Sequence, residues 1–279
     1  MNATSQNANA KVSRPIVQVD LAGPDGPLKL HTSVQAVNLT LRVAACAGFA
    51  LSGCTGGDSG SAVRAPGDDK SARTATLEAG AAALQRMPPI GSINAYLDGF
   101  HFYNGRMEQQ MEAHHYCALL NEDVIQCVIY DGNTKDAKLM GVEYIVSEKL
   151  FAGLAPAEKS LWHSHVHEVK SGQLIAPGIP EAAEHALMAK LIHTYGKTWH
   201  TWHTDSHDRL PLGMPQLMMG FTADGQSDSE LVRARDRRFG IDSQDEKKAR
   251  ADIVAPTIDP AADAWQRGTT VQIPDPRTK

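Results

Sequence analysis

The sequence predicts a single α+β domain in which a mainly antiparallel sheet is flanked by a few helices, with a disordered leader before it and an extended tail behind it. Three strand-like runs, at residues 114–119, 124–131 and 139–147, are β-branched or alternate between apolar and polar residues. The connections between them contain turn residues and are too short for crossover helices, so these strands are expected to pair antiparallel. Apolar residues at helical spacing, clearest at residues 181–195, predict the helices.

Three further segments before residue 163 carry helical signals. Apolar residues at helical spacing predict a short helix at residues 74–87, before two prolines, and residues 106–112 also fit a helix. Pro156 at a first helical position, followed by Glu158 in the first turn, predicts a short helix within residues 154–162.

The second half follows the same rules. Gly196 is placed to cap the helix at residues 181–195. Strands are expected at residues 197–204 and 216–221, a charged helix at 229–238, and then a tail interrupted by prolines. The predicted segments are a leader at 1–53, a tether and entry helix at 54–88, the domain at 89–222, and a polar helix and tail packing on it at 223–279.

Composition excludes several classes of protein. The chain has 279 residues, of which 42% are hydrophobic, so a wholly disordered protein is excluded. The formal charge of −5 provides no basic surface, and nucleic acid is not expected as a partner. No apolar run approaches the roughly 18–20 residues that a membrane-spanning helix requires.

The N-terminal region contains a lipidation signal. Arg42 precedes a small-residue apolar stretch at 43–51, and the sequence LSGC that ends at Cys54 resembles the lipobox of bacterial lipoproteins, in which the cysteine is acylated. This pattern predicts a lipid-anchored protein of the cell envelope, attached to its membrane through acylated Cys54. Forty-one residues precede Arg42, which is long for a signal peptide, so a cytoplasmic protein is the alternative if Met1 is the true start.

Histidine is concentrated in the part of the sequence that is expected to fold. Eleven of the 12 histidines lie between His101 and His207. On a strand, residues 163, 165 and 167 would share one face, as a row of imidazoles suited to zinc or another divalent metal. His115 and Cys117 would share one face of their own strand, with His114 on the other, and a third cluster lies at 200–207.

Two other interpretations of these histidines remain open. They either satisfy backbone groups on a half-buried polar surface or include a catalytic histidine that works without a metal. The sequence lacks the HExxH pattern of zinc proteases and the GxSxG elbow of serine hydrolases. Cys117 and Cys127 are not spaced for a zinc finger, and the four cysteines do not predict a disulfide scaffold.

The same segments resemble the oil-body-associated protein family over about residues 90–270. The resemblance is carried by these stretches: GFHFYNGRM (99–107), EAHHYC (112–117), LNEDVIQCVIYD (120–131), AKLMGVEYIVSEKLF (137–151), LWHSHVHEVKSG (161–172), TYGKTWHTWHTD (194–205) and LPLGMPQLMMGFT (210–222). The family has no established biochemical activity, so the resemblance implies a lipid-surface or structural role.

The resemblance also selects the site residues. The family pattern matches at His114, His115, His163, His165 and Glu168, whereas His167 is at a variable position. The four matching histidines are the expected metal ligands, and Glu168 is the expected general base of the alternative function, a divalent-metal-dependent, hydrolase-like enzyme.

Overall fold

The computed structural model describes residues 57–275. The expected leader, the signal and Cys54 lie outside the described residues. Within residues 57–275, none of the helices combines the length and the hydropathy needed to cross a membrane.

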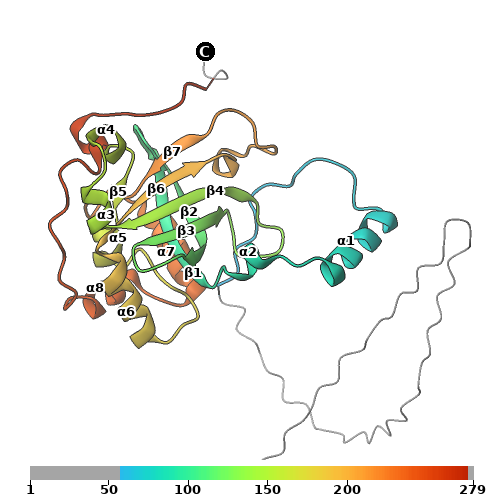
Figure 1. Cartoon of the computed structure of the whole chain (residues 1–279), viewed down its shortest axis with the longest axis horizontal. Helices are drawn as coiled ribbons and strands as arrows, with labels where there is room; N and C mark the ends of the chain where they lie inside the picture. Colours follow the sequence, from blue (N-terminus) through green and yellow to red (C-terminus); the bar gives the residue numbers. More distant parts are fainter. Residues whose placement is uncertain (1–56, 276–279) are drawn as a thin grey trace, which may run out of the picture. The chain divides into compact units, whose positions relative to one another are not determined.

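Six antiparallel strands form a closed barrel (Figure 1). The strands run in the order β4-β3-β2-β1-β7-β6, and pairing of β4 with β6 closes the ring. Beyond the end of β7, a short strand, β5 (His163–Ser164), continues along β6. The strands of the barrel are β1 (Ala95–Tyr103), β2 (Arg106–Leu119), β3 (Val124–Tyr130), β4 (Leu139–Ser147), β6 (Thr194–His200) and β7 (Gln216–Met219).

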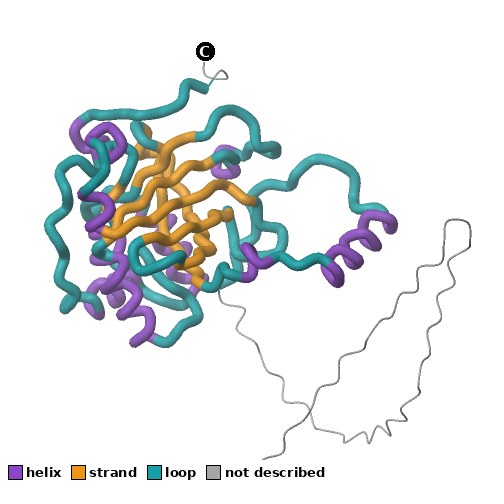
Figure 2. The backbone as a smooth tube through the Cα atoms, in the orientation of Figure 1, coloured by secondary structure: helices purple, strands orange, loops and turns teal. Residues whose placement is uncertain are grey.

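The helices are short and most of them gather along one side of the strands (Figure 2). The predicted α+β class with a mainly antiparallel sheet is therefore confirmed. The helices are α1 (Ala72–Leu84), α2 (Pro88–Gly91), α3 (Glu148–Ala152), α4 (Pro156–Lys159), α5 (Val166–Lys170), α6 (Glu181–Leu191), α7 (Ser229–Phe239) and α8 (Ser243–Ala249), with single 3-10 turns at Thr204–Ser206 and Ala264–Arg267.

The helical interpretation of residues 106–112 is wrong, because this segment is the first half of β2. Glutamine, glutamate and methionine in this segment are good helix formers, but the turn at Asn104 and Gly105 returns the chain antiparallel to β1. Gly105 has a φ of +84°, which glycine adopts without strain. Pairing along the whole length of β1, a strand that local pattern did not reveal, overrides helix propensity here.

Two expectations near the histidines are also wrong. Residues 163–167 do not form one strand, because β5 ends at Ser164 and His165 is the N-cap residue of α5. Gly196 does not cap a helix: α6 ends at Leu191, and Gly196 lies inside β6, opposite Ile145 of β4 on one edge and His163 of β5 on the other.

One disulfide joins two neighbouring strands of the barrel. Cys117 of β2 and Cys127 of β3 are direct cross-strand partners and are joined through their sulfur atoms. Both cysteines are buried in an apolar cluster with Leu97 and Ile145. The sulfur of Cys117, which the sequence places on the same strand face as His115, is therefore engaged in a covalent bond.

Candidate metal centre

Inward-facing positions of four strands bring polar residues together inside the barrel. Alternation along a strand points every second side chain inward. Because β5 and the start of α5 lie next to β6, three more polar residues reach the same space. All seven side chains belong to residues that are at most 6% exposed: His101, His115, Glu143, His163, His165, Glu168 and His200.

Glu143 lies at the centre of this cluster. Its Oε2 is 2.9 Å from Nε2 of His115 and 3.6 Å from Nε2 of His101. Its Oε1 is 3.1 Å from Nε2 of His165 and 3.6 Å from Nε2 of His163. One carboxylate thus faces four imidazole nitrogens from three segments of the chain: β1, β2 and the junction of β5 with α5.

Hydrogen bonds determine which nitrogen of His165 carries a proton. The hydroxyl of Thr194 donates to the carbonyl oxygen of Leu191 at 2.6 Å, so its oxygen accepts from Nδ1 of His165 at 2.7 Å. In a neutral imidazole Nε2 then has a bare lone pair, and it faces the Glu143 oxygen 3.1 Å away. Two acceptors at that distance repel, so a cation, either a proton or a metal ion, must lie between them.

Burial keeps several of the imidazoles neutral. Removal from water, together with the nearby charge of His115, lowers the pKa of His200 and of His163 to about 3 and that of His101 well below its usual range. Burial also acts to raise the pKa of Glu143, but the adjacent imidazoles of His115 and His165 outweigh it and hold that pKa well below normal. Neutral imidazoles beside a carboxylate are in the protonation states that metal binding requires.

Glu168 is in the opposite electrostatic situation. Burial, and next the negative charge of Glu143, raise its pKa well above the usual range for a glutamate. Its Oε2 lies 3.8 Å from Nε2 of His165. A bound cation would oppose this shift, because a nearby positive charge favours the ionised form of the carboxyl group.

Several nitrogens of the cluster have no hydrogen-bond partner within residues 57–275. These are Nδ1 of His101 and both ring nitrogens of His115, of His163 and of His200. Buried polar atoms without partners are rare and each costs about 1–3 kcal/mol. A small cavity of about 20 Å³ borders His101, His115, Glu143 and His165, which is enough room for one water molecule or ion.

Gly196 leaves the centre of the cluster open. A Cβ atom at this position would lie 2.1 Å from Oε1 of Glu143 and 2.8 Å from Nε2 of both His163 and His165. Any side chain here would occupy the space between these three groups. A backbone that approaches so closely requires glycine, whatever its φ angle.

The structure brings together four of the five residues expected from the sequence, namely His115, His163, His165 and Glu168, but not His114. His114 lies on the outer face of β2, where its Nδ1 is 2.9 Å from Asp98 and 2.8 Å from the hydroxyl of Tyr96. Asp98 also pairs with buried Arg235. His114 therefore belongs to a separate cluster with Asp98 and Glu112, and the guanidinium groups of Arg235 and Arg238 pair with these two acids.

Three members of the centre were not among the expected site residues: His101, Glu143 and His200. Glu143 could have been recognised from the sequence as a site residue, because it is an acidic residue at an inward position of the mainly apolar strand segment GVEYIVS. His101 and His200 gave no such signal, since their strand registers follow from long-range pairing. The remaining histidines of the 200–207 cluster lie elsewhere: His203 bonds Tyr103, and His207 is exposed.

Comparison with known proteins identifies the family. Residues 87–254 match the family described as a protein of unknown function, DUF1264, and this range contains every residue of the candidate metal centre. The chain is 45% identical to oil body-associated protein 1A of Zea mays over 213 residues, 76% of this chain and 90% of the relative.

Other plant relatives support the same family assignment. No solved structure shows a significant match. Identity is 42% with oil body-associated protein 1B of Arabidopsis thaliana over 75% of this chain and 87% of the relative. It is 44% with oil body-associated protein 2B of Zea mays over 72% and 82%. This chain belongs to the oil-body-associated protein family, the DUF1264 family.

Proposed function

We propose that the barrel of this protein binds one divalent transition-metal ion, such as zinc. The observation that carries the proposal is the contact between Glu143 and the bare Nε2 of His165, which requires a cation between two acceptors. His115 and His163 complete a set of imidazole and carboxylate donors around the same point.

The spacing of these donors suits a first-row metal. Zinc–nitrogen and zinc–oxygen bonds of about 2.0–2.1 Å in a tetrahedral site place neighbouring ligand atoms about 3.4 Å apart. The separations between Glu143 oxygens and the four imidazole nitrogens, 2.9–3.6 Å, bracket that value. Thr194, which accepts from the far nitrogen of His165, is the kind of supporting partner that orients a metal-ligating histidine.

Metal analysis tests this proposal directly. Purified full-length protein is expected to contain about one equivalent of metal by mass spectrometry, and chelation is expected to lower its melting temperature. Glu143→Gln and His163→Asn should abolish stoichiometric binding, whereas His185→Asn, at a partly exposed position on α6, serves as the matched control. Absence of stoichiometric metal, together with an unchanged melting temperature after chelation, would contradict the proposal.

A hydrolase-like activity is the second candidate, and Glu168 favours it. A carboxyl group with a raised pKa beside a metal is a suitable general base. The adjoining cavity of about 20 Å³ holds only an ion or a water molecule, so turnover of an organic substrate requires the barrel to open. Glu168→Gln should abolish such activity while retaining bound metal.

We also propose that this metal-binding domain works at a lipid surface, anchored to the cell envelope through acylated Cys54. The plant relatives are named for their association with oil bodies, and the LSGC sequence at Cys54 supports the anchor. The Cys117–Cys127 disulfide supports an oxidising compartment, since cytosolic thiols are usually kept reduced.

Labelling with a radioactive fatty acid tests the anchor. The wild-type protein and the matched control Cys46→Ala should incorporate label and fractionate with membranes, whereas Cys54→Ala should do neither. Unlabelled wild-type protein in the cytosolic fraction would refute the anchor and support the cytoplasmic alternative.

A further inference from the structure

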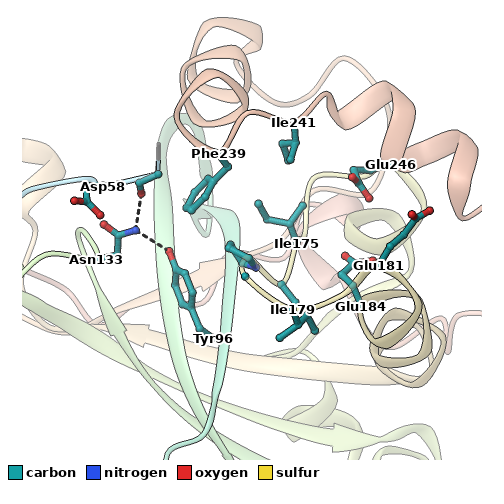
Figure 3. A pocket seen from close by; sticks show the side chains of 14 residues that line it. Asp58, Tyr96, Asn133, Ile175, Ile179, Glu181, Glu184, Phe239, Ile241 and Glu246 are labelled. Carbon is teal, nitrogen blue, oxygen red and sulfur yellow. Dashed lines mark hydrogen bonds between the residues drawn. The ribbon is translucent and has the colours of Figure 1, made fainter. Parts of the chain in front are cut away.

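A second cavity lies away from the metal centre, on the outside of the barrel (Figure 3). Its volume is about 530 Å³, which is in the range of small-molecule sites. Side chains from β1, from the start of α6 and from the α7–α8 region line it, and none of them belongs to the candidate metal centre.

The middle of this cavity is apolar. Ile175, Ile179 and Ile241 lie around it together with the ring of Phe239 (Figure 3). Ile179 is 43% exposed, so the apolar wall is open to solvent. Such a surface releases water when it takes up a hydrocarbon group.

One side of the cavity is acidic. Glu181 and Glu184 from α6 and Glu246 from α8 gather there (Figure 3). Among the described residues that line the cavity there is no lysine or arginine. The nearest guanidinium, that of Arg250, is buried and is shared between Glu184 and Glu246.

These charges leave negative potential for a ligand. The guanidinium of Arg250 donates to the carbonyl oxygens of Val169 and Leu174 and pairs with Glu184, so these partners already engage its charge. Glu181 has no ion-pair partner among residues 57–275. The helix dipoles favour acids in the first turns of α6 and α8, and these two turns direct Glu181 and Glu246 to the same cavity.

We propose that this cavity binds an organic cation with an apolar body, namely an alkylammonium group. The ammonium lies against Glu181 and Glu246, and the hydrocarbon packs among Ile175, Ile179 and Phe239. The ring of Phe239 adds a surface that attracts cations. This inference goes beyond the metal proposal and does not depend on it, because the two sites share no residue.

Calorimetric titration of the full chain with three ligands of equal chain length tests the charge requirement. Octylammonium is expected to bind, octanol to bind at least about tenfold more weakly, and octanoate not to bind. Glu181→Gln should weaken octylammonium binding about fivefold, which corresponds to one lost charge near a protein surface. The matched control is Glu108→Gln, at an exposed glutamate of β2 that does not line the cavity.

A second variant tests the apolar wall and keeps the experiment decisive. Ile179→Ser changes a partly exposed side chain, so it should fold, as circular dichroism can check, and it should also weaken octylammonium binding. The proposal would be overturned if octanoate or octanol bound as tightly as octylammonium. It would also be overturned if Glu181→Gln and Glu108→Gln bound octylammonium with the same affinity.

Vesicles distinguish two sources of the same chemistry. Binding to phosphatidylethanolamine vesicles that is lost in Glu181→Gln assigns a lipid headgroup as the ligand. Binding of octylammonium without vesicle binding assigns a free amine. If neither octylammonium nor the vesicles bind, the proposal is overturned, and the separate proposal of a metal centre is not affected.

Discussion

Replacing His200 with glutamine should change how the stability of the metal-free protein depends on pH. His200 is fully buried, and burial together with the charges of His115 and His203 lowers its pKa to about 3. In the unfolded chain the same imidazole has a pKa of about 6.5. The folded state therefore binds fewer protons, and stability is lost as the pH falls from about 6.5 toward about 3.

The magnitude follows from the two pKa values. At about pH 5 the unfolded imidazole is protonated and the folded one is not, and the difference of about 1.5 pH units corresponds to about 2 kcal/mol. His200→Gln removes this contribution. Between about pH 7.5 and pH 5 the free energy of unfolding of the variant should therefore rise by about 2 kcal/mol relative to that of the wild type.

Urea denaturation in the presence of a chelator, followed by tryptophan fluorescence, measures the effect. Using the difference between two proteins cancels the opposite contribution of Glu112, whose pKa burial raises to about 7. His185→Gln is the control, because solvent reaches that imidazole in the folded state as well. If the free energies of unfolding of the wild type and of His200→Gln depend on pH in parallel, the conclusion that His200 is buried in its neutral form is refuted.

Three further predictions concern single contacts. Gly196→Ala should lower metal content at least tenfold in the purified protein, because the added Cβ would lie 2.1 Å from Oε1 of Glu143; full metal occupancy would show that the ion lies elsewhere. Asp98→Asn should lower the free energy of unfolding by about 3–5 kcal/mol in urea, since it removes a buried carboxylate that pairs with both Arg235 and His114, while Asp236 still pairs with Arg235; a loss below about 1 kcal/mol would argue against those pairs. Reduction of the disulfide, which closes a loop of sequence separation 10, should cost about 3 kcal/mol, measured as a lower urea midpoint with dithiothreitol; an unchanged midpoint would mean that the bond does not constrain the unfolded chain.

Much of the sheet was predictable because three of its strands carry strong local patterns. Residues 124–131 and 139–147 are β-branched or alternating, and they form β3 and β4 almost as expected. The charged helix at 229–238 was also readable, since Asp228 caps its start and Gly240 follows its end. These elements are specified by neighbours in sequence.

Elements that depend on distant partners were not predictable in the same way. Residues 106–112 have good helix formers and become a strand only because β1 pairs with them. The pairing of β7 with both β1 and β6 has no signature in the local sequence, yet it brings the strands of His101 and His200 close together. The sequence therefore identified most ligands that are close together in the chain, whereas it missed those that the barrel assembles.

The position of the disulfide bears on how the metal centre is stabilised. Cys127 is the cross-strand partner of Glu143 on one side and of Cys117 on the other, and Cys117 lies two residues from His115. The covalent bond therefore holds β2 and β3 at the level where β2 supplies a ligand and β4 supplies the central carboxylate. An interior with seven polar residues would favour unfolding if they were free to seek water. The disulfide limits that relaxation at β2 and β3, and in the proposed metal site a bound cation would recover free energy that hydrogen bonds do not supply to the nitrogens of His163 and His200.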